Sequence, residues 1–312
     1  MPFADNSHKV VKAKASVASQ VFTYENLVHA ISGMTGGVSA ISMFFPLNQL
    51  RMRLQVDEKL RAQNPFVLLT KIAKEEGVQS LYTGWWSSVV SLGCSNFVYF
   101  YVYNALKIIY LKRAAKKEMD AVTNLAVASV AGTINVLATT PLWVVGTRLA
   151  VQNRKALKAM EMSRSGRKPY KGVFNSLLRI ISEEGVAALW KGVGPSLILV
   201  SNPSIQFVTY ERLRAPLARW AEKRGSPITA FEFFLCGAIA KAVATVLTYP
   251  LQIAQSKLRA DRGNAKDPTQ RNYRGTLDCL QKIAKRDGIP GWFKGMETKL
   301  WQTVLTAAFQ FL

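Results

Sequence analysis

The fold is decided by the stretch Pro141-Leu142-Trp143-Val144-Val145-Gly146-Thr147-Arg148, because the same pattern occurs twice more in the chain. One further copy begins at Pro46 and the other at Pro250. Each copy places Pro-Leu at the end of an apolar stretch and a basic residue seven positions after the proline. Recurrence at intervals of about a hundred residues indicates three tandem repeats.

The composition is typical of a membrane protein. Of the 312 residues, 49% are hydrophobic and 19% are charged. The apolar residues gather in about six stretches of the ~20 residues that a membrane-spanning helix needs. The net charge of +22 suits nucleic acid, anionic lipid or an anionic substrate as the partner. Because the basic residues lie mostly between the apolar stretches, lipid and substrate are favoured, and nucleic acid is not expected.

Each repeat is predicted to contain a span, a short amphipathic surface helix and a second span. The surface helices are expected at 64–76, 172–185 and 275–288, each with a glycine next to an acidic residue at its end. A proline is expected to break or kink the end of the first span of each repeat. The spans are predicted at 27–47, 85–110, 121–145, 193–213, 228–251 and after Gly295.

The predicted fold class is therefore an all-α membrane protein, with six transmembrane helices in three tandem repeats and pseudo-threefold symmetry around a central cavity. We expect a flexible tail at 1–23 and repeats at 24–113, 118–222 and 227–312. The last span has no counterpart of 103–107 or 210–214. We therefore expect that the chain lacks its natural C-terminus.

Catalytic and metal sites are not expected. The three cysteines, Cys94, Cys236 and Cys279, are far apart and are interpreted as buried small apolar residues. Two histidines, His8 and His29, are too few for a metal site. The sequence contains no P-loop and no nucleophile motif, so we predict no enzyme, no metal and no cofactor. The first 20 residues have no apolar core of a secretory signal, so internal targeting would need a receptor that reads the basic loops.

The motifs resemble the mitochondrial carrier family (solute carrier family 25). The resemblance rests on the three prolines and on the pairs Glu76-Gly77, Glu184-Gly185 and Asp287-Gly288, with Gly84, Gly192 and Gly295 downstream. Stretches 95–100, 141–145 and 201–207 are most similar to the animal peroxisomal membrane branch.

That resemblance implies exchange of coenzyme A, FAD, NAD and adenosine phosphates (AMP, ATP) by alternating access to a central site. These nucleotides would be transported substrates, not cofactors. The implied location is the peroxisomal membrane, with membrane lipid and an import receptor for peroxisomal membrane proteins as further partners, and we expect a monomer. Two alternatives stay open: a mitochondrial inner-membrane carrier of a similar anion, and a membrane scaffold or receptor whose basic loops dock proteins.

The resemblance also implies two gates. In a typical member, six residues form an ion-pair ring that closes the organelle side, and here only Arg51 of these is charged. We expect a weaker closure by hydrogen bonds of Asn48 or Gln252 with Gln255, and by packing of Trp143. The organelle-side gate comprises Asn48, Arg51, Trp143, Gly146, Gln252 and Gln255. The cytosolic-side gate comprises Asn104, Lys107, Glu211 and Arg214, although the last two could instead form an exposed pair within one helix.

The predicted substrate contacts come from two sources. By resemblance, the contact points are Ser91, Leu92, Ile198, Leu199, and Gln302 or Thr303. Polar groups within spans cost free energy unless they face a partner or a cavity, which singles out Asn96, Asn202 and Lys241.

Lys241 is the most specific candidate, because it stands where the other repeats have Gly37 and Gly132. Facing the cavity, it would attract phosphate; alternatively, it extends to the interface or bonds helix carbonyls. Three threefold-related basic residues could pass phosphates along or pair with loop carboxylates, and both interpretations are kept open: Arg53, Arg148 and Lys257.

Overall fold

The computed structural model describes residues 38–39, 41–56, 64–114, 118–151, 170, 172–261 and 273–310. The predicted tail 1–23, both histidines and Gly37 lie outside these ranges. Within them the regular elements are all helical, which confirms the predicted all-α class. The helices are α3 (Phe45–Val56), α4 (Pro65–Glu76), η2 (Val78–Tyr82), α5 (Trp85–Ala114), α6 (Ala121–Ala150), α8 (Val173–Glu184), η3 (Val186–Trp190), α9 (Val193–Leu199), α10 (Asn202–Arg224), α11 (Ala230–Ala260), α12 (Thr276–Asp287), η4 (Ile289–Phe293) and α13 (Met296–Gln310).

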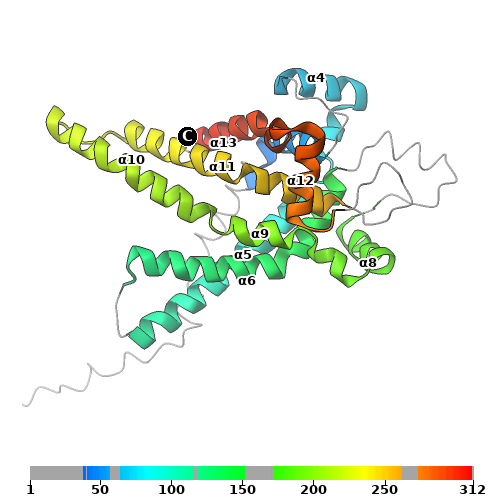
Figure 1. Cartoon of the computed structure of the whole chain (residues 1–312), viewed down its shortest axis with the longest axis horizontal. Coiled ribbons are helices and arrows are strands. Elements are labelled where there is room, and N and C mark those ends of the chain that lie inside the picture. Colours follow the sequence, from blue (N-terminus) through cyan, green and yellow to red (C-terminus); the bar gives the residue numbers. More distant parts are fainter. Residues whose placement is uncertain are drawn as a thin grey trace, which may run out of the picture.

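The same order of elements occurs three times. A helix that carries the Pro-Leu motif is followed by a twelve-residue surface helix, a 3-10 turn and a second span. The surface helices α4, α8 and α12 lie toward one end of the molecule (Figure 1). The α5–α6 pair and the α10–α11 pair diverge toward the other end. This arrangement is the predicted three-repeat carrier architecture.

The spans expose their apolar side chains. By length and composition alone, α6 and α11 can each cross a membrane, and only 6% and 17% of their most apolar windows are buried inside the protein. Phe97 and Tyr101 of α5 are exposed in the same way. Helices that point large apolar groups outward are adapted to lipid as their surroundings.

The spans that carry the prolines run further than predicted. α6 continues through Pro141 to Ala150, and α11 continues through Pro250 to Ala260, so the predicted ends at 145 and 251 are wrong. A proline inside a helix removes one hydrogen bond to the carbonyl four residues earlier. In α6 that carbonyl belongs to Leu137, and the indole Nε1 of Trp190 donates to it at 2.9 Å. A side chain from the same repeat therefore compensates for the proline.

The fourth span is broken, whereas a continuous helix was predicted. α9 ends at Leu199 and α10 begins at Asn202, with Pro203 in its first turn. Pro203 has no N–H to donate, and its ring would clash with the carbonyl of Leu199 in an unbroken helix. At this break Val200 packs against Gly132 of α6, where an added Cβ would lie 2.9 Å from Val200 Cγ1.

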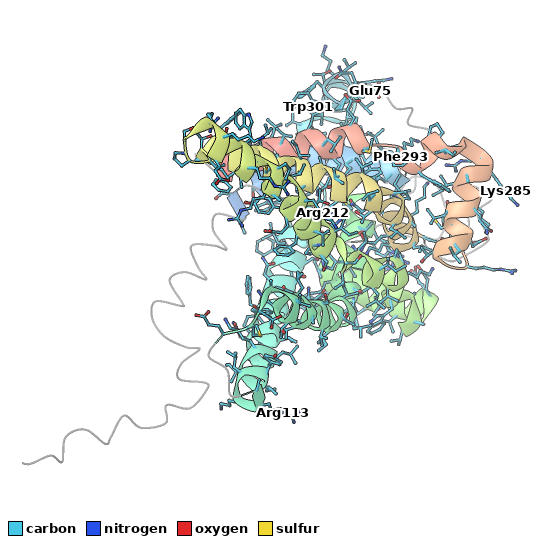
Figure 2. The ribbon with its side chains drawn as sticks, turned by 60° about the vertical axis from the view of Figure 1, so that its left-hand side comes forward. Glu75, Arg113, Arg212, Lys285, Phe293 and Trp301 are labelled. Atoms are coloured by element: carbon cyan, nitrogen blue, oxygen red, sulfur yellow. The ribbon has the colours of Figure 1, made fainter. Side chains whose placement is uncertain are left out.

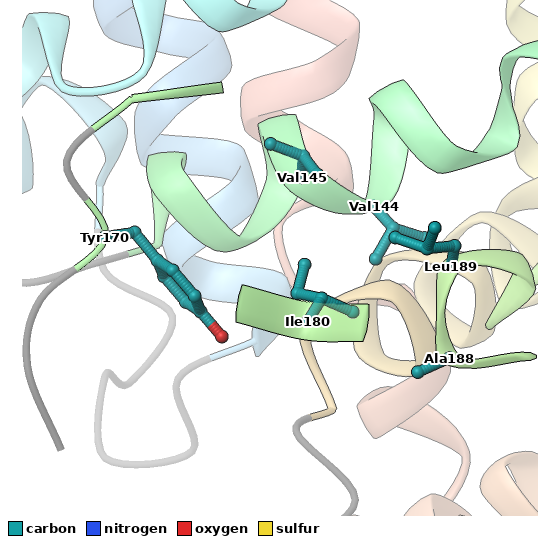
Figure 3. Packing of buried hydrophobic residues seen from close by; sticks show 6 residues of the cluster. All are labelled: Val144, Val145, Tyr170, Ile180, Ala188 and Leu189. Carbon is teal, nitrogen blue, oxygen red and sulfur yellow. The ribbon is translucent and has the colours of Figure 1, made fainter. Parts of the chain in front are cut away.

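Each surface helix packs on the kinked helix of its own repeat. In the second repeat, Ile180 of α8 meets Val144 and Val145 of α6 (Figure 3). Equivalent buried clusters join α3 to α4 and α11 to α12. The predicted bounds of the surface helices agree with the structure to within a residue or two at each end. Asn64, which replaces the capping glycine in the first repeat, accepts a hydrogen bond from the Phe66 N–H at 3.0 Å.

The interpretation of the cysteines is correct for one of the three. Cys279 is buried between α11 and α12, where burial raises the pKa of its thiol to about 12. Cys236 is half-buried and Cys94 is exposed, so the prediction of burial is wrong for Cys94. Cys94 lies on α5 three residues before the outward-facing Phe97, on a helix that exposes apolar side chains.

Candidate substrate cavity and gates

A cavity of about 480 Å³ lies between α5, α6 and the broken span α9–α10. Arg51 of α3 and the end of α11 complete its lining, so all three repeats contribute to it. The lining is Arg51, Ser95, Tyr99, Leu125, Ala128, Ser129, Gly132, Asn135, Val136, Thr139, Thr140, Trp143, Ser196, Leu199, Val200, Pro203, Ser204, Gln255 and Arg259. The volume is within the ~300–1,000 Å³ that is typical of small-molecule sites.

The α5–α6 wall of the cavity is polar. Asn135 Nδ2 donates to Ser95 Oγ at 3.0 Å, and the Ser95 hydroxyl lies 3.3 Å from Asn135 Oδ1. Tyr99 lies one turn further along α5. None of these residues was predicted, although an amide within an apolar span is a signal of the same kind as Asn96 and Asn202.

Positive charge gathers at the closed end of the cavity. Arg51 of α3 and Arg259 of α11 both line it. Lys299 of α13 lies outside the lining. No aspartate or glutamate lines the cavity within the described part of the chain. Arg259 and Lys299 were not predicted.

The structure brings few of the predicted contact points to the cavity. Leu199 lines it, together with Arg51, Trp143 and Gln255 of the predicted gate. Leu92, Thr303 and Gln302 are half-buried outside the lining, and the buried Oε1 of Gln302 accepts no hydrogen bond from the described residues.

Other predicted contact points join helices to each other. Ser91 is buried between α5 and α6, where its hydroxyl lies 3.1 Å from the Leu142 carbonyl. Asn202 Nδ2 donates to Thr248 Oγ1 at 2.7 Å and links α10 to α11. Asn96 and Ile198 are exposed. Lys241 Nζ donates to Gln206 Oε1 at 3.2 Å, on the same face of α11 as the buried Thr245.

Two of the threefold basic residues contact carboxylates at the surface helices. Arg53 pairs with Glu76 at 2.8 Å. Arg148 donates hydrogen bonds to both carboxylate oxygens of Glu184, at 2.6 and 3.0 Å. For Arg53 and Arg148, these contacts favour the interpretation that they pair with carboxylates over the interpretation that they pass substrate phosphates along the cavity.

In the third repeat, the equivalent acid is Asp287, at the end of α12. A hydrogen bond from Arg286, with the charges of Arg286, Lys294 and Lys257, holds the pKa of Asp287 below its ordinary value. Lys257 is buried, and the ion pair that Asp287 forms within the described residues is with its neighbour Arg286, so the direct pairing of the other two repeats is not repeated at Asp287.

The organelle-side gate differs from the expectation. Gln255 Nε2 donates to Ser196 Oγ at 2.7 Å, and not to Asn48 or Gln252, which contact residues of their own helices. Trp143 packs against the guanidinium of Arg259, whose Cζ lies 5.7 Å from the ring centroid. The predicted hydrogen bonds between gate amides are therefore wrong, because Ser196 is the partner that Gln255 reaches.

Gly146, the remaining residue of the predicted organelle-side gate, lies at the interface of α5 and α6. An added Cβ would meet Ser91 Oγ at 3.4 Å. A basic side chain at this position, as in typical family members, would have to push the two helices apart. A glycine at position 146 thus explains both features: it carries no charge, and it lets α5 and α6 pack closely.

Closure comes from a second layer, near the ends of the kinked helices. Gln55 of α3 accepts from Ser256 Oγ at 2.8 Å and donates to the Tyr249 hydroxyl at 3.1 Å, which joins α3 to α11. Gln49 donates to the carbonyl of Ala150, which joins α3 to α6.

The third junction of this layer joins α6 to α11. Arg148 Nε donates to the carbonyl of Arg259 at 3.2 Å, and its Nη2 donates to that of Asp261 at 2.7 Å. Hydrogen bonds and one buried guanidinium thus connect all three repeats where a typical member relies on an ion-pair ring.

The cytosolic-side gate residues are apart. Glu211 and Arg214 form a 3.8 Å pair within α10 and are both about half-exposed, as in the alternative given above. Lys107 is exposed, and in the described residues no ion pair joins α5 to α10. Figure 2 shows Arg113 at the tip of α5 and Arg212 on α10, on separate arms of the molecule. In the described residues these side chains therefore do not close the space between α5 and α10.

A bundle of spans around a cationic cavity, sealed at one end, defines a membrane carrier. The chain belongs to the mitochondrial carrier family, whose sequence pattern, described as mitochondrial carrier protein, matches residues 22–114, 117–219 and 226–312.

Three relatives illustrate the branch of the family. The chain is 45% identical to peroxisomal membrane protein PMP34 of Mus musculus, over 94% of this chain and 93% of that protein. It is 42% identical to mitochondrial substrate carrier family protein Q of Dictyostelium discoideum, over 93% and 87%. It is 36% identical to the peroxisomal nicotinamide adenine dinucleotide carrier of Arabidopsis thaliana, over 92% and 93%. These matches confirm the predicted family, its peroxisomal membrane branch and the peroxisomal membrane location.

Proposed function

We propose that the chain exchanges phosphate-bearing, nucleotide-type anions, such as coenzyme A, FAD, NAD, AMP and ATP, across the peroxisomal membrane by alternating access to its cavity. The observation that carries the proposal is the pair of guanidinium groups that line the cavity, Arg51 and Arg259, with Lys299 and Lys241 on the neighbouring helices α13 and α11. Within the described residues no carboxylate lines this cavity, so we take the counter-ion of the two guanidinium groups to be a bound substrate.

The remaining lining suits the other parts of a nucleotide. Asn135 and Ser95 offer an amide and a hydroxyl, which can hydrogen-bond to a ribose or to the edge of a base. Tyr99 and Leu199 provide surfaces for a flat or apolar group. Two relatives are named as a peroxisomal nicotinamide adenine dinucleotide carrier and a peroxisomal adenine nucleotide carrier, which supports a nucleotide as the substrate class.

The two ends of the cavity support alternating access. Hydrogen bonds of the second layer hold the closed end, where the Gln55 side chain is only 1% exposed. The other end has no such contacts between α5 and α10 in the described residues. Exchange requires the reverse state, in which these bonds open and the cytosolic-side residues come together; only a substrate with different affinity for the two states can shift that equilibrium.

Counter-exchange in reconstituted vesicles tests the proposal. Vesicles with purified protein are loaded with coenzyme A, FAD, NAD or ATP, and uptake of labelled ATP is measured with and without internal substrate. We expect uptake to depend on internal substrate, and a Lys241→Gln, Lys299→Gln double variant to lose most of it. The control, Lys223→Gln, removes an exposed cation at the end of α10 and should keep wild-type uptake. A wild-type protein that folds but exchanges none of these compounds would contradict the proposal and favour a scaffold.

A further inference from the structure

We propose that Arg51 and Arg259 together bind a phosphate group of the substrate, and that this phosphate supplies the negative charge that the organelle-side gate lacks. The inference rests on the proposed function and identifies the place in the cavity where the phosphate binds. It also gives Arg259, which lies outside the positions of the gate ring, a direct contact with the substrate.

The two guanidinium groups form one site. They come from α3 and α11 and line the same cavity. The Nε of each is buried and makes no hydrogen bond within the described residues. Buried donors without acceptors cost free energy, and so do buried charges without a counter-ion. An anion between them removes both costs.

Within the described residues, no carboxylate lines the cavity beside this pair. The three positions that hold acids in a typical member are occupied by Asn48, Trp143 and Gln252. The hydrogen-bond partner of the Arg259 Nη2 is the neutral hydroxyl of Ser196, at 3.1 Å. A planar guanidinium binds phosphate through two parallel hydrogen bonds, so the chemistry of both side chains favours a phosphate over a single point anion.

Arg259 also connects the cavity with the closed gate. Its side chain packs over Trp143, and its main-chain carbonyl accepts the hydrogen bond from Arg148 Nε that holds α11 to α6. A phosphate that draws the Arg259 side chain toward Arg51 therefore acts on the residue at which α6 and α11 meet. The bound phosphate thus supplies the negative charge that the gate ring lacks, and this charge leaves the gate when the substrate leaves.

The asymmetry of the site supports a single phosphate position. The residues that correspond to Arg259 in the first and second repeats are Gln55 and Ala150. The Gln55 side chain forms hydrogen bonds with Ser256 and Tyr249, and Ala150 has no polar side chain. Of the three residues at this position of the motif, Arg259 alone is charged.

Ligand binding by the reconstituted chain tests the proposal, with inorganic pyrophosphate, ATP and adenosine as probes. We expect Arg259→Gln to weaken the binding of pyrophosphate and ATP at least about tenfold, because a charge-assisted hydrogen bond is lost, and to leave adenosine unchanged. Arg259→Lys keeps the charge but not the paired geometry and should fall between wild type and Arg259→Gln. Arg219→Gln, an exposed change on α10, is the matched control with wild-type affinity.

A second variant tests the role of the phosphate as a counter-ion. Trp143→Glu places a carboxylate opposite Arg259, so we expect pyrophosphate binding to fall about tenfold and leak from preloaded vesicles to decrease. Trp143→Gln, which adds no charge, should not lower leak. Wild-type pyrophosphate affinity in both Arg259→Gln and Trp143→Glu would overturn the inference while leaving nucleotide exchange intact. A wild-type chain that exchanges no nucleotide would instead overturn the proposed function, and this inference with it.

Discussion

The guanidinium of Arg259 lies over the indole ring of Trp143, with Cζ 5.7 Å from the ring centroid. Trp143 occupies a position where a typical family member has an acid, so an aromatic face takes the place of a carboxylate beside a cation. Cation–π contacts contribute ~0.5–2 kcal/mol, the larger value when the pair is removed from water. The contact therefore offsets part of what the absent ion pair would contribute to closure.

Replacing Trp143 should loosen the closed end. Trp143→Leu removes the ring, and we expect the free energy of unfolding to fall by about 1 kcal/mol and leak of preloaded ATP to rise. Trp143→Phe keeps an aromatic face and should retain most of the closure. Thermal unfolding in lipid and efflux without external substrate measure the two effects. Equal leak in Trp143→Phe and Trp143→Leu would show that ring packing over Arg259 does not matter.

Adjacent acids of α8 should differ strongly in their contribution to stability. Glu184 is 8% exposed and pairs with the fully buried Arg148, whereas Glu183 is 42% exposed and pairs with Arg179. Removing one partner of a buried pair leaves the other charge uncompensated, so Glu184→Gln should cost about 3 kcal/mol. Glu183→Gln should cost less than about 1 kcal/mol. Thermal unfolding of the two variants in the same lipid makes the comparison, and similar melting temperatures would contradict it.

The surface helices could be predicted from sequence because their ends are local. Asn64 caps α4 through its own side chain, and glycines flank the corresponding ends of α8 and α12. The break in the fourth span was missed, although Pro203 is visible in the sequence, and a break or kink was expected instead at the Pro-Leu motifs, where α6 and α11 continue through their prolines. Whether a proline breaks a helix depends on its tertiary partners, such as Trp190 for the Leu137 carbonyl.

The site was predicted less well. Its contact points were placed by their distance in residues from the gate positions, which assumes that the helices of the three repeats are straight and equivalent. Ser91 was expected in the cavity, but Gly146 allows α5 and α6 to approach closely, and Ser91 is buried between them. Arg259 and Lys299 were missed for another reason. Their counterparts in the other repeats are neutral, namely Gln55 and Ala150 for Arg259 and Ser88 and Ser196 for Lys299. Lys241 is also a charge that one repeat alone carries, but Arg259 and Lys299 were not compared with their repeat-related residues in the same way.

Gly84 should tolerate substitution less well than Gly77, although both have a positive φ, of 81° and 84°. Gly77, with ψ 153°, has a backbone conformation that is essentially restricted to glycine, so Gly77→Ala should cost about 1–3 kcal/mol. Open space surrounds Gly77, so no steric clash is added to this backbone cost. At Gly84 an added Cβ would lie 2.8 Å from the Cα of Ala150. Gly84→Ala should therefore also displace α6, whose Ala150 carbonyl accepts from Gln49.

Two measurements separate these contributions at Gly84. We expect a melting temperature clearly below that of Gly77→Ala, and leak from preloaded vesicles in the Gly84 variant alone. If the two alanine variants unfold at the same temperature and neither leaks, close packing of Gly84 on Ala150 does not support the closed end.

Gln55 should couple energetically to Ser256 across the α3–α11 junction. Gln55→Leu leaves the buried Ser256 hydroxyl without its acceptor. The Tyr249 hydroxyl loses the hydrogen bond from Gln55, but it still donates to the Lys294 carbonyl at 3.1 Å. An unsatisfied buried group costs ~1–3 kcal/mol, so we expect a loss of about 2 kcal/mol and faster leak.

A double-mutant cycle with Ser256→Ala isolates this junction. Once Ser256→Ala has removed the hydroxyl, Gln55→Leu no longer strands it, so the two losses should fall short of additivity by at least ~0.5 kcal/mol. The control pairs Gln55→Leu with Ser182→Ala, an exposed change on α8 that shares no partner with Gln55, and should be additive. Additive losses in both cycles would mean that the Gln55–Ser256 hydrogen bond does not hold α3 to α11. Closure would then depend on Gln49, on Arg148 and on packing.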